Sequence, residues 1–417
     1  MKEKLQWAWR WFWSDERLLV VGFLATGLMM YGLLFSRGLL SSGMISMISN
    51  MVLNRRIGFW FKVYIKDIVL LAFTLIFFSR LLSVINSSPT TFMMDRIRIW
   101  LPFIILPFGF VIMKQLPAKF IRLLFLFFIS MMLVECIHLT VLYFNSQLSE
   151  GTTYSTGHTM NTPFSHIRFS LMVAFAFVLC VSLLRNNAGL FPVFEKWFLL
   201  ITSVFLFAFM HLLAVRSGLV AMYLCILILI LNEIWVRKTR MIGLAILICF
   251  LCVALISFWF VPTLHQKIGY MKYDLSQFFD NQNPSQLSDA SRVISIQKGL
   301  VLFKQNPMMG TGIGDLKKKM NALYQNYPDM PSEKRLPHNE FIYVLASGGL
   351  IGLLLFGIGI FTPLFFHKNY KQLLFLCFYI IILSSFITEA TLEEQIGTGF
   401  YSVFGLLIYS NLNFRES

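Results

Sequence analysis

The residues best placed to do chemistry form one spaced pattern in the last quarter of the chain. His338 and Asn339 are followed, after nine residues, by Gly349. Gly352 lies three positions further on. A neutral imidazole can take a proton from a sugar hydroxyl near pH 7, which is the work of a general base. Pro337 disfavours helix before the histidine, so we expect His338 at or just before a helix start.

His338 also has a simpler interpretation, because a lone histidine beside an apolar segment is often only a polar anchor. The two glycines have a packing interpretation as well. Gly349 and Gly352 follow the histidine on the predicted helix, and small residues at this spacing let helices approach closely in lipid. We therefore expect the glycines to serve packing rather than chemistry.

Three arginines are candidate ligands for an anionic group. Arg216 stands between two apolar runs, Arg168 opens another apolar run, and Arg292 begins a helical pattern. A guanidinium group can hold a phosphate through two parallel N–H donors. The alternative is that these side chains reach lipid headgroups or water. We take all three arginines, together with Asn339, as candidate substrate-binding residues.

Carboxylates are scarce inside the apolar runs. Glu135 falls within one run, while Glu389, Glu393 and Glu394 mark the last polar turn. Each is predicted to pair with an arginine or to orient His338, and Glu389 is the candidate orienting acid. No Asp-x-Asp pattern occurs on a polar loop next to these residues, so we expect neither a metal site nor a cofactor.

The composition is that of a membrane protein. Of the 417 residues, 57% are hydrophobic and 13% are charged, whereas about a quarter are charged in soluble domains. The apolar runs are continuous rather than alternating, which favours helices over a barrel. The net charge of +15 is dispersed among these runs and forms no basic stripe for nucleic acid. We therefore expect an all-α polytopic protein whose partner is the lipid bilayer.

About twelve apolar segments have lengths near the roughly 20 residues that a helix needs to cross a membrane. They are 18–36, 38–53, 63–79, 98–113, 121–144, 167–184, 197–214, 217–235, 241–261, 341–361, 371–388 and 397–412. This pattern divides the chain into an N-terminal bundle of about nine helices (1–261), a polar loop (262–340) and about three C-terminal helices (341–417). The bundle is preceded by an interfacial stretch with Trp7, Trp9, Trp11 and Trp13. Six cysteines all lie in apolar runs, where we expect buried thiols.

The distribution of Lys and Arg predicts the orientation. With the N-terminus in the cytoplasm, the inner connections carry most of the Lys and Arg, and the outer connections carry scattered arginines, among them Arg80 and Arg96. The loop 262–340 and His338 then lie outside the cytoplasm. No ATP is present there, so a transfer reaction needs an activated donor carried on a lipid. Gly310, Gly312 and Gly314 therefore indicate a backbone turn rather than a nucleotide loop, since the run lacks the Lys-Ser/Thr of a phosphate loop.

Taken together, these residues resemble the O-antigen ligase and polymerase superfamily of bacterial membrane glycosyltransferases. The ligase motif His-[Asn/Ser/Gln]-x9-Gly-x-x-Gly is matched in full by the pattern that begins at His338. The Arg216 turn is similar to the family's arginine at an outer helix end. The run from Arg292 through Pro307 to Gly310 and Gly312 looks like the family's loop signature. The motifs that carry the resemblance lie within about 205–415. In the expected number and order of membrane segments, the chain resembles the family over most of its length.

The resemblance implies a GT-C-like fold and a metal-independent, inverting glycosyl transfer. The donor would be a polysaccharide on undecaprenyl pyrophosphate, and the ligase acceptor would be lipid A–core oligosaccharide or another glycan. Arginines would hold the pyrophosphate and His338 would be the base, at the periplasmic face of the bacterial inner membrane. On this basis we expect an O-antigen ligase.

Three alternatives stay open at this point. An O-antigen or exopolysaccharide polymerase would use the same donor with a second lipid-linked chain as acceptor. A protein O-oligosaccharyltransferase would modify a protein instead. A polysaccharide or lipid transporter should show inverted repeats and polar residues or broken helices near the middle of the membrane. Here most apolar segments are apolar throughout and the polar groups gather at one face, which favours an enzyme.

Overall fold

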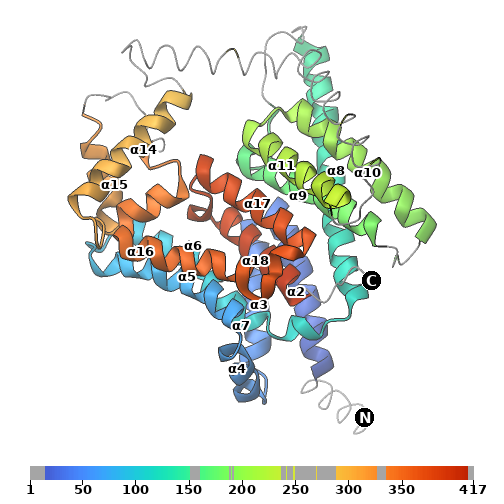
Figure 1. The fold of residues 1–417 in the computed structure, drawn as a ribbon, viewed down its shortest axis with the longest axis horizontal. Coiled ribbons are helices and arrows are strands. Elements are labelled where there is room, and N and C mark those ends of the chain that lie inside the picture. The colour runs from blue at the N-terminus through green and yellow to red at the C-terminus, as the bar shows by residue number, and fades with distance from the viewer. Residues whose placement is uncertain are drawn as a thin grey trace.

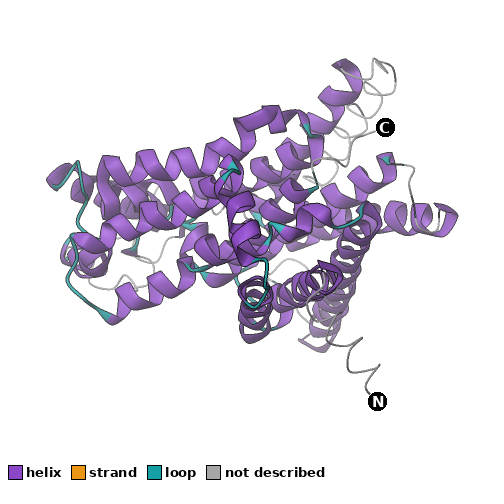
Figure 2. Ribbon diagram, turned by 90° about the horizontal axis from the view of Figure 1, so that it is seen from below, coloured by secondary structure: helices purple, strands orange, loops and turns teal. Residues whose placement is uncertain are grey.

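The computed structural model of the chain is built from helices (Figure 2). It describes residues 15–150, 160–186, 189, 192–235, 241, 248, 269, 288–325 and 335–411. Every regular element within these ranges is a helix, as the continuous apolar runs predicted. The aromatic stretch before residue 15 and the cysteines Cys249 and Cys252 lie outside the described residues. The other four cysteines are buried.

Seven helices in the described part are long and apolar enough to cross a membrane. They are α2 (Asp15–Phe35), α5 (Ile68–Ile85), α8 (Ala118–Glu150), α9 (His166–Arg185), α10 (Pro192–Leu213), α11 (Arg216–Trp235) and α16 (Glu340–Phe365). The chain is therefore a multi-pass membrane protein. The count of about twelve spans stays a prediction, because the segment 241–261 lies almost entirely outside the described residues.

Two of the expected segments are divided into shorter helices. The segment 63–79 is interrupted by Asp67, whose side-chain oxygen accepts hydrogen bonds from the backbone N–H groups of Val69 and Leu70. Asp67 is thus the N-cap of α5, and the preceding helix, α4 (Ile57–Ile65), ends two residues before it. The segment 98–113 is likewise divided at Pro102, between α6 (Thr91–Trp100) and α7 (Pro102–Gly109). Pro is favoured at a helix start and disfavours helix in the residue before it.

The described part also contains further helices and turns. Three helices of 16 residues, α3 (Arg37–Val52), α17 (Leu373–Thr388) and α18 (Gln395–Ser410), pack among the long ones. In the described part of the polar region lie α14 (Ser288–Gln305) and α15 (Ile313–Ala322). The described residues also form three 3-10 turns: η1 (Ile112–Gln115), η5 (Phe366–Lys371) and η6 (Thr391–Glu393).

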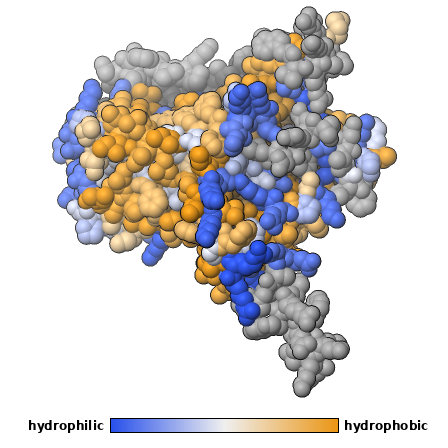
Figure 3. Space-filling view, turned by 60° about the horizontal axis from the view of Figure 1, so that its bottom comes forward, coloured by the Kyte–Doolittle hydropathy of each residue, from blue (hydrophilic) through white to orange (hydrophobic). Residues whose placement is uncertain are grey.

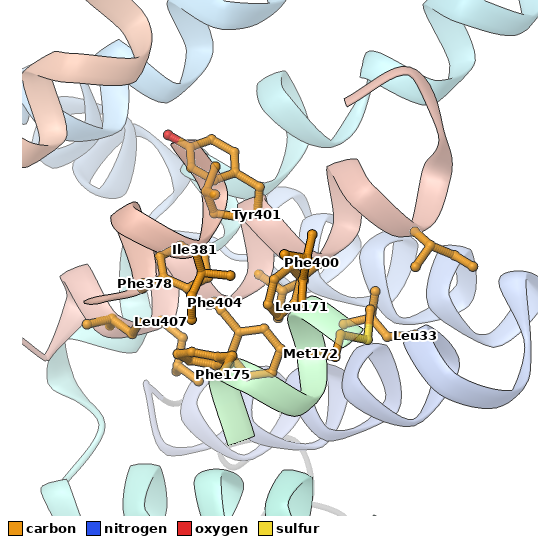
Figure 4. Packing of buried hydrophobic residues seen from close by; sticks show 14 of the residues in the cluster. Leu33, Leu171, Met172, Phe175, Phe378, Ile381, Phe400, Tyr401, Phe404 and Leu407 are labelled. Carbon is orange, nitrogen blue, oxygen red and sulfur yellow. The ribbon is translucent and has the colours of Figure 1, made fainter. Parts of the chain in front are cut away.

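The C-terminal helices lie at the centre of the molecule. Figure 1 shows α17, α18 and α2 between α8–α11 on one side and α5, α16, α14 and α15 on the other. Phe175 of α9 packs edge-on against Phe378 of α17 and Phe404 of α18, with ring centroids 5.2 and 4.8 Å apart (Figure 4). Nearly every residue of α18 is buried, so this helix lies within the protein core.

The outer surface is apolar over broad areas (Figure 3). On α10, for example, Val193 and Phe194 are each 73% exposed, and Ile201 is 65% exposed. Contiguous exposed side chains of this kind are unfavourable in water and favourable in hydrocarbon. The helices therefore direct part of their apolar surface inward and part of it toward lipid.

Helix α16 is broken at Gly349, whose backbone angles are φ 64° and ψ −162°. In an unbroken helix, the N–H groups of Leu350 and Ile351 would donate to the carbonyls of Ala346 and Ser347. Instead, Leu350 N donates to Pro307 O at 2.8 Å and Ile351 N donates to Met308 O at 3.2 Å. The two released carbonyls accept from the turn as well.

The turn that follows α14 completes this exchange. Thr311 N donates to Ala346 O at 2.9 Å, and Gly312 N donates to Ser347 O at 3.0 Å. All four backbone groups released by the break thus find partners, as buried backbone groups must. Gly310 and Gly312 have positive φ values of 69° and 79°. The glycine-rich run is therefore a backbone turn, as the sequence predicted.

The two glycines of the histidine pattern have different environments. A Cβ atom on Gly349 would lie 2.4 Å from the Met308 carbonyl carbon and oxygen. A Cβ atom on Gly352 would meet its nearest neighbour, Ser79 O, at 3.8 Å. The expectation that both glycines serve close helix packing needs correction for Gly349. That residue provides the positive φ and the backbone space on which the broken helix depends.

Replacement of Gly349 by Ala should destabilise the protein strongly. The new Cβ would overlap the Met308 carbonyl, and the positive φ alone costs about 1–3 kcal/mol for a non-glycine residue. We expect a large fall in the thermal midpoint of the detergent-solubilised protein and in its abundance in membranes. Gly352→Ala is the matched control and should stay near wild type. Equal midpoints for the two variants would contradict this account of the break.

Candidate active site

A pocket of about 330 Å³ opens beside His338. It lies among α6, the first turn of α9, α15, the approach to α16, and the connection 389–394 between α17 and α18. Its walls are Phe92, Arg96, Arg168, Lys317, Leu336, Pro337, His338, Tyr343, Glu389, Ala390, Glu393 and Glu394. Three of the residues predicted from the sequence, His338, Arg168 and Glu389, are therefore brought together.

His338 is held at the entrance of α16, where the sequence pattern placed it. Its backbone N–H donates to Ser295 Oγ of α14 at 3.1 Å. Pro337 packs against Gly299 one turn further along α14, where an added Cβ would lie 2.9 Å from the proline ring. The imidazole Nδ1 lies 3.4 Å from Glu389 Oε1, and the two side chains are 20% and 16% exposed. Helix α14 therefore holds the backbone at His338, while Glu389 contacts the ring, which lines the pocket.

The surroundings of Glu389 favour its ionised form. Burial would raise the pKa of this carboxyl group, but the hydrogen bond to His338 and the charges of His338, Arg168 and Arg292 outweigh burial and lower the pKa below its ordinary value. The resulting stabilisation is present above the ordinary pKa and is lost as pH falls through the lowered value. At neutral pH the carboxylate can accept the Nδ1 proton, which leaves the imidazole Nε2 to act as a base.

Arg168 fixes the connection that carries the carboxylates. Its Nη1 lies 2.9 Å from Glu394 Oε2 and its Nη2 donates to Ala390 O at 3.4 Å. The side chain is 5% exposed. A buried arginine with a carboxylate and a carbonyl as partners holds these groups in place. Arg168 therefore orders the pocket wall in addition to lining the pocket.

Arg292 and Arg216 do not line the pocket. Arg292 is half-buried one turn before Ser295 on α14, and its charge contributes to the lowered pKa of Glu389. Arg216 is the half-buried first residue of α11. Two positions later, Gly218 packs so closely on Ser170 that an added Cβ would lie 2.4 Å from the serine oxygen. The start of α11 thus lies beside the start of α9, which carries Arg168.

Both polar atoms of the Asn339 side chain form hydrogen bonds with backbone groups of the protein. Its Oδ1 accepts from Ile342 N at 3.0 Å and caps α16, and its Nδ2 donates to Ile387 O of α17 at 3.1 Å. It is not among the residues that line the pocket. Glu135 also lies elsewhere, on α8, where its carboxylate is 3.5 Å from His138 Nδ1. Among the acids named from the sequence, Glu389 is the one that contacts His338.

A buried ion cluster lies directly behind the pocket. Arg80 of α5 pairs with Glu340, the first residue of α16, and its Nη1 lies 3.2 Å from Glu393 Oε1. The side chains of Arg80 and Glu340 are 2% and 0% exposed. Glu340 Oε2 also accepts from Leu392 N at 2.9 Å. The guanidinium of Arg80 lies over the Phe356 ring, 4.6 Å from its centroid. The cluster thus joins α5, α16 and the connection 389–394.

Arg96 extends the cluster to the pocket wall. Its Nη1 lies 3.8 Å from Glu393 Oε2 and also donates to Glu393 O. The sequence interpretation counted Arg80 and Arg96 only as scattered arginines of the outer face and did not consider Glu340. A usable signal was present, because Glu340 is an acid that directly follows His338-Asn339 and precedes an apolar run. Such an acid requires a cationic partner when buried.

Residues 201–357 match the family model described as O-Antigen ligase. These residues form an O-antigen ligase superfamily domain. The match covers less than half of the chain and supports a membrane glycosyltransferase of the ligase or polymerase type. The comparison with curated proteins finds no match.

The O-antigen ligase domain contains only part of the pocket. It contains His338, Lys317 and α14, together with Arg216, Arg292 and the break at Gly349. Other residues of the site lie on either side of it in the sequence. Glu389 and Glu393 follow the matched segment, and Arg80 and Arg96 precede it. The pocket and the ion cluster behind it are therefore formed by residues both inside and outside the matched segment.

Removal of Arg80 should be severely destabilising, because it leaves Glu340 and Glu393 buried without their main cation. Loss of one partner from a buried pair typically costs about 3–5 kcal/mol. We expect Arg80→Ala to lower the free energy of unfolding by that order, as measured by denaturant unfolding in detergent. Arg98→Ala is the control, since Arg98 is 77% exposed and pairs with an exposed Asp95. A stable Arg80→Ala protein would show that the cluster is dispensable.

Proposed function

We propose that the protein is an O-antigen ligase that transfers a polysaccharide from undecaprenyl pyrophosphate to lipid A–core oligosaccharide. The observation that carries the proposal is the His338–Glu389 pair, which lies in a polar pocket at the start of the histidine pattern. An imidazole oriented by a carboxylate is an arrangement suited to a general base. The family match supports a glycosyltransferase.

The reaction is a single displacement. His338 Nε2 takes the proton of an acceptor hydroxyl as that oxygen attacks the anomeric carbon of the donor sugar. The new glycosidic C–O bond forms while the bond from the anomeric carbon to the pyrophosphate breaks, and the lipid pyrophosphate leaves with the bonding electrons. Attack opposite the leaving group inverts the anomeric centre. Glu389 stabilises the imidazolium that forms.

Cations are required near the leaving group because negative charge develops on the pyrophosphate. In this proposal Arg216 and Arg292 contact it, and Arg168 orders the wall of the pocket. Asn339 positions the histidine through its cap on α16. The reaction needs no metal ion or cofactor, since guanidinium groups supply the positive charge.

The proposal also includes a location. The loop 262–340 and the pocket face the periplasm, and the protein lies in the bacterial inner membrane. The excess of Lys and Arg on the opposite connections supports this orientation. The lipid-linked donor then reaches the pocket from the outer leaflet, and the acceptor from the same leaflet.

Replacement of His338 by Ala should reduce transfer by about 10²–10⁴-fold, because a general base is lost. The assay uses purified protein in proteoliposomes with lipid-linked donor and lipid A–core acceptor. The control is His138→Ala, which removes a histidine that also lies beside a glutamate but outside the pocket. His338→Ala activity above about a tenth of wild type excludes a base of this strength. Transfer only to a second lipid-linked chain would identify a polymerase instead.

Arg216 should not tolerate lysine if it binds the pyrophosphate through two donors. Lysine keeps the charge but loses the planar fork. We expect Arg216→Lys to transfer nearly as poorly as Arg216→Ala at equal protein abundance. Arg37→Lys, at the exposed start of α3, should have no effect. Near-normal transfer by Arg216→Lys would leave contact with lipid headgroups as the better account of this residue.

A further inference from the structure

The cations of the pocket wall differ in whether they already have a partner. Arg96 pairs with Glu393, and Arg168 pairs with Glu394. His338 lies beside Glu389. The connection 389–394 therefore supplies one carboxylate partner to each of these three groups. The remaining cation of the wall is Lys317.

Lys317 has no carboxylate within ion-pair distance among the described residues. Its ammonium lies 5.9 Å from the centroid of the Phe92 ring, which is another wall residue. The nearest acid in the sequence, Asp315, is directed elsewhere. Its Oδ2 accepts from Ser88 N at 3.1 Å and from Ser88 Oγ at 3.3 Å. The positive charge of Lys317 is thus available to a ligand in the pocket.

The helix that carries Lys317 is firmly docked. Ile313, Gly314, Leu316 and Met320 of α15 are buried. Gly314 N donates to Ser87 Oγ at 3.0 Å, and a Cβ on Gly314 would lie only 2.0 Å from Ser88 O. Lys317, Lys318 and Lys319 are all exposed, but only Lys317 is among the wall residues. The docking therefore selects one lysine of the three for the pocket.

We propose that the Lys317 ammonium binds a phosphate group of the substrate. This inference rests on the proposed function. The observation is a docked, unpaired ammonium in the same pocket as His338, whose other cations already have carboxylate partners. For Arg96 or Arg168 to bind a phosphate, the guanidinium would have to leave or share its carboxylate. Lys317 makes the contact without breaking a pair, and its flexible stem lets a compact charge follow the phosphate.

Two sources of phosphate have the same chemistry at this position. One is the pyrophosphate of the lipid-linked donor, and the other is a phosphate group on the lipid acceptor. Both lie at the membrane surface, where the pocket would receive its substrates in the proposed reaction. Separate measurements for donor and acceptor distinguish the two sources.

The experiment compares Lys317→Ala with Lys318→Ala, which removes a neighbouring exposed charge outside the pocket. Both purified full-length proteins should have the wild-type thermal midpoint, because neither side chain is buried. Transfer rates are measured in proteoliposomes while donor and acceptor are varied separately. Undecaprenyl pyrophosphate without a glycan serves as a direct binding probe.

We expect Lys317→Ala to raise the KM for one substrate about tenfold, in line with the loss of a charged hydrogen bond, while kcat stays within about twofold. Lys317→Arg should recover most of the affinity, and Lys318→Ala should match wild type. A raised donor KM, with weaker binding of the probe, assigns the donor pyrophosphate. A raised acceptor KM that disappears with dephosphorylated acceptor assigns an acceptor phosphate.

Three results would overturn the assignment of Lys317. They are unchanged KM values for both substrates, equal effects of Lys317→Ala and Lys318→Ala, and a fall in kcat alone. Failure of the wild-type protein to transfer any glycan would instead contradict the proposed function. In that case, binding of undecaprenyl pyrophosphate and of phosphorylated lipid A to wild type and Lys317→Ala decides the role of Lys317 by itself. Equal binding of both lipids by the two proteins would reject it.

Discussion

The buried pair between Arg80 and Glu340 is the interaction on which the pocket depends. A charge without a partner is costly in an apolar bundle, so Arg80 requires acids and Glu340 requires a cation. Glu393 is drawn to the same guanidinium at 3.2 Å, and this contact anchors the connection that carries Glu389 and Glu394. The entrance of α16 and the turn between α17 and α18 are therefore held against each other. His338 and Glu389 meet because their flanking segments share one buried cation.

A second fixed point explains the spacing of the histidine pattern. Between Glu340 and the break at Gly349, α16 makes two to three turns, which span roughly 14 Å. One end of this stretch is fixed by Arg80, and the other by the backbone turn 307–312. Insertion of one residue would rotate one end by about 100° relative to the other. The separation of His338-Asn339 from Gly349 thus keeps both contacts possible at once.

The parts of the fold set by local composition were predictable from the sequence. Uninterrupted apolar runs predicted the long helices α2, α8, α9, α10 and α11. Pro337 predicted that His338 lies near a helix start. Interruptions were less predictable, because Asp67 and Pro102 divide runs that are apolar on average. The break in α16 could not be foreseen, since it depends on hydrogen bonds with a turn about 40 residues earlier in the chain.

For the site as well, the sequence predicted individual residues but not the contacts between residues that are distant in the chain. The family resemblance indicated His338, Arg216 and Arg292, and the position of Glu389 suggested an orienting acid. No pattern in the sequence indicated that Arg80 pairs with an acid 260 positions away. It also could not separate Lys317 from Lys318 and Lys319, because the selection comes from how α15 packs on residues 86–90. Such pairings are properties of the tertiary fold.

The ion pairs between cations and glutamates in the pocket wall would also affect how the His338 pocket releases its product. In the proposed reaction, the lipid pyrophosphate is more highly charged after the transfer than before it. A wall of unpaired arginines would hold this product tightly and slow the next cycle. Carboxylates that are already in place compete with the pyrophosphate for the guanidinium groups, while the one unpaired ammonium still favours its approach. Under the proposed function, the three glutamates of the wall favour turnover, because they limit affinity for the product while they orient the proposed base and its neighbours.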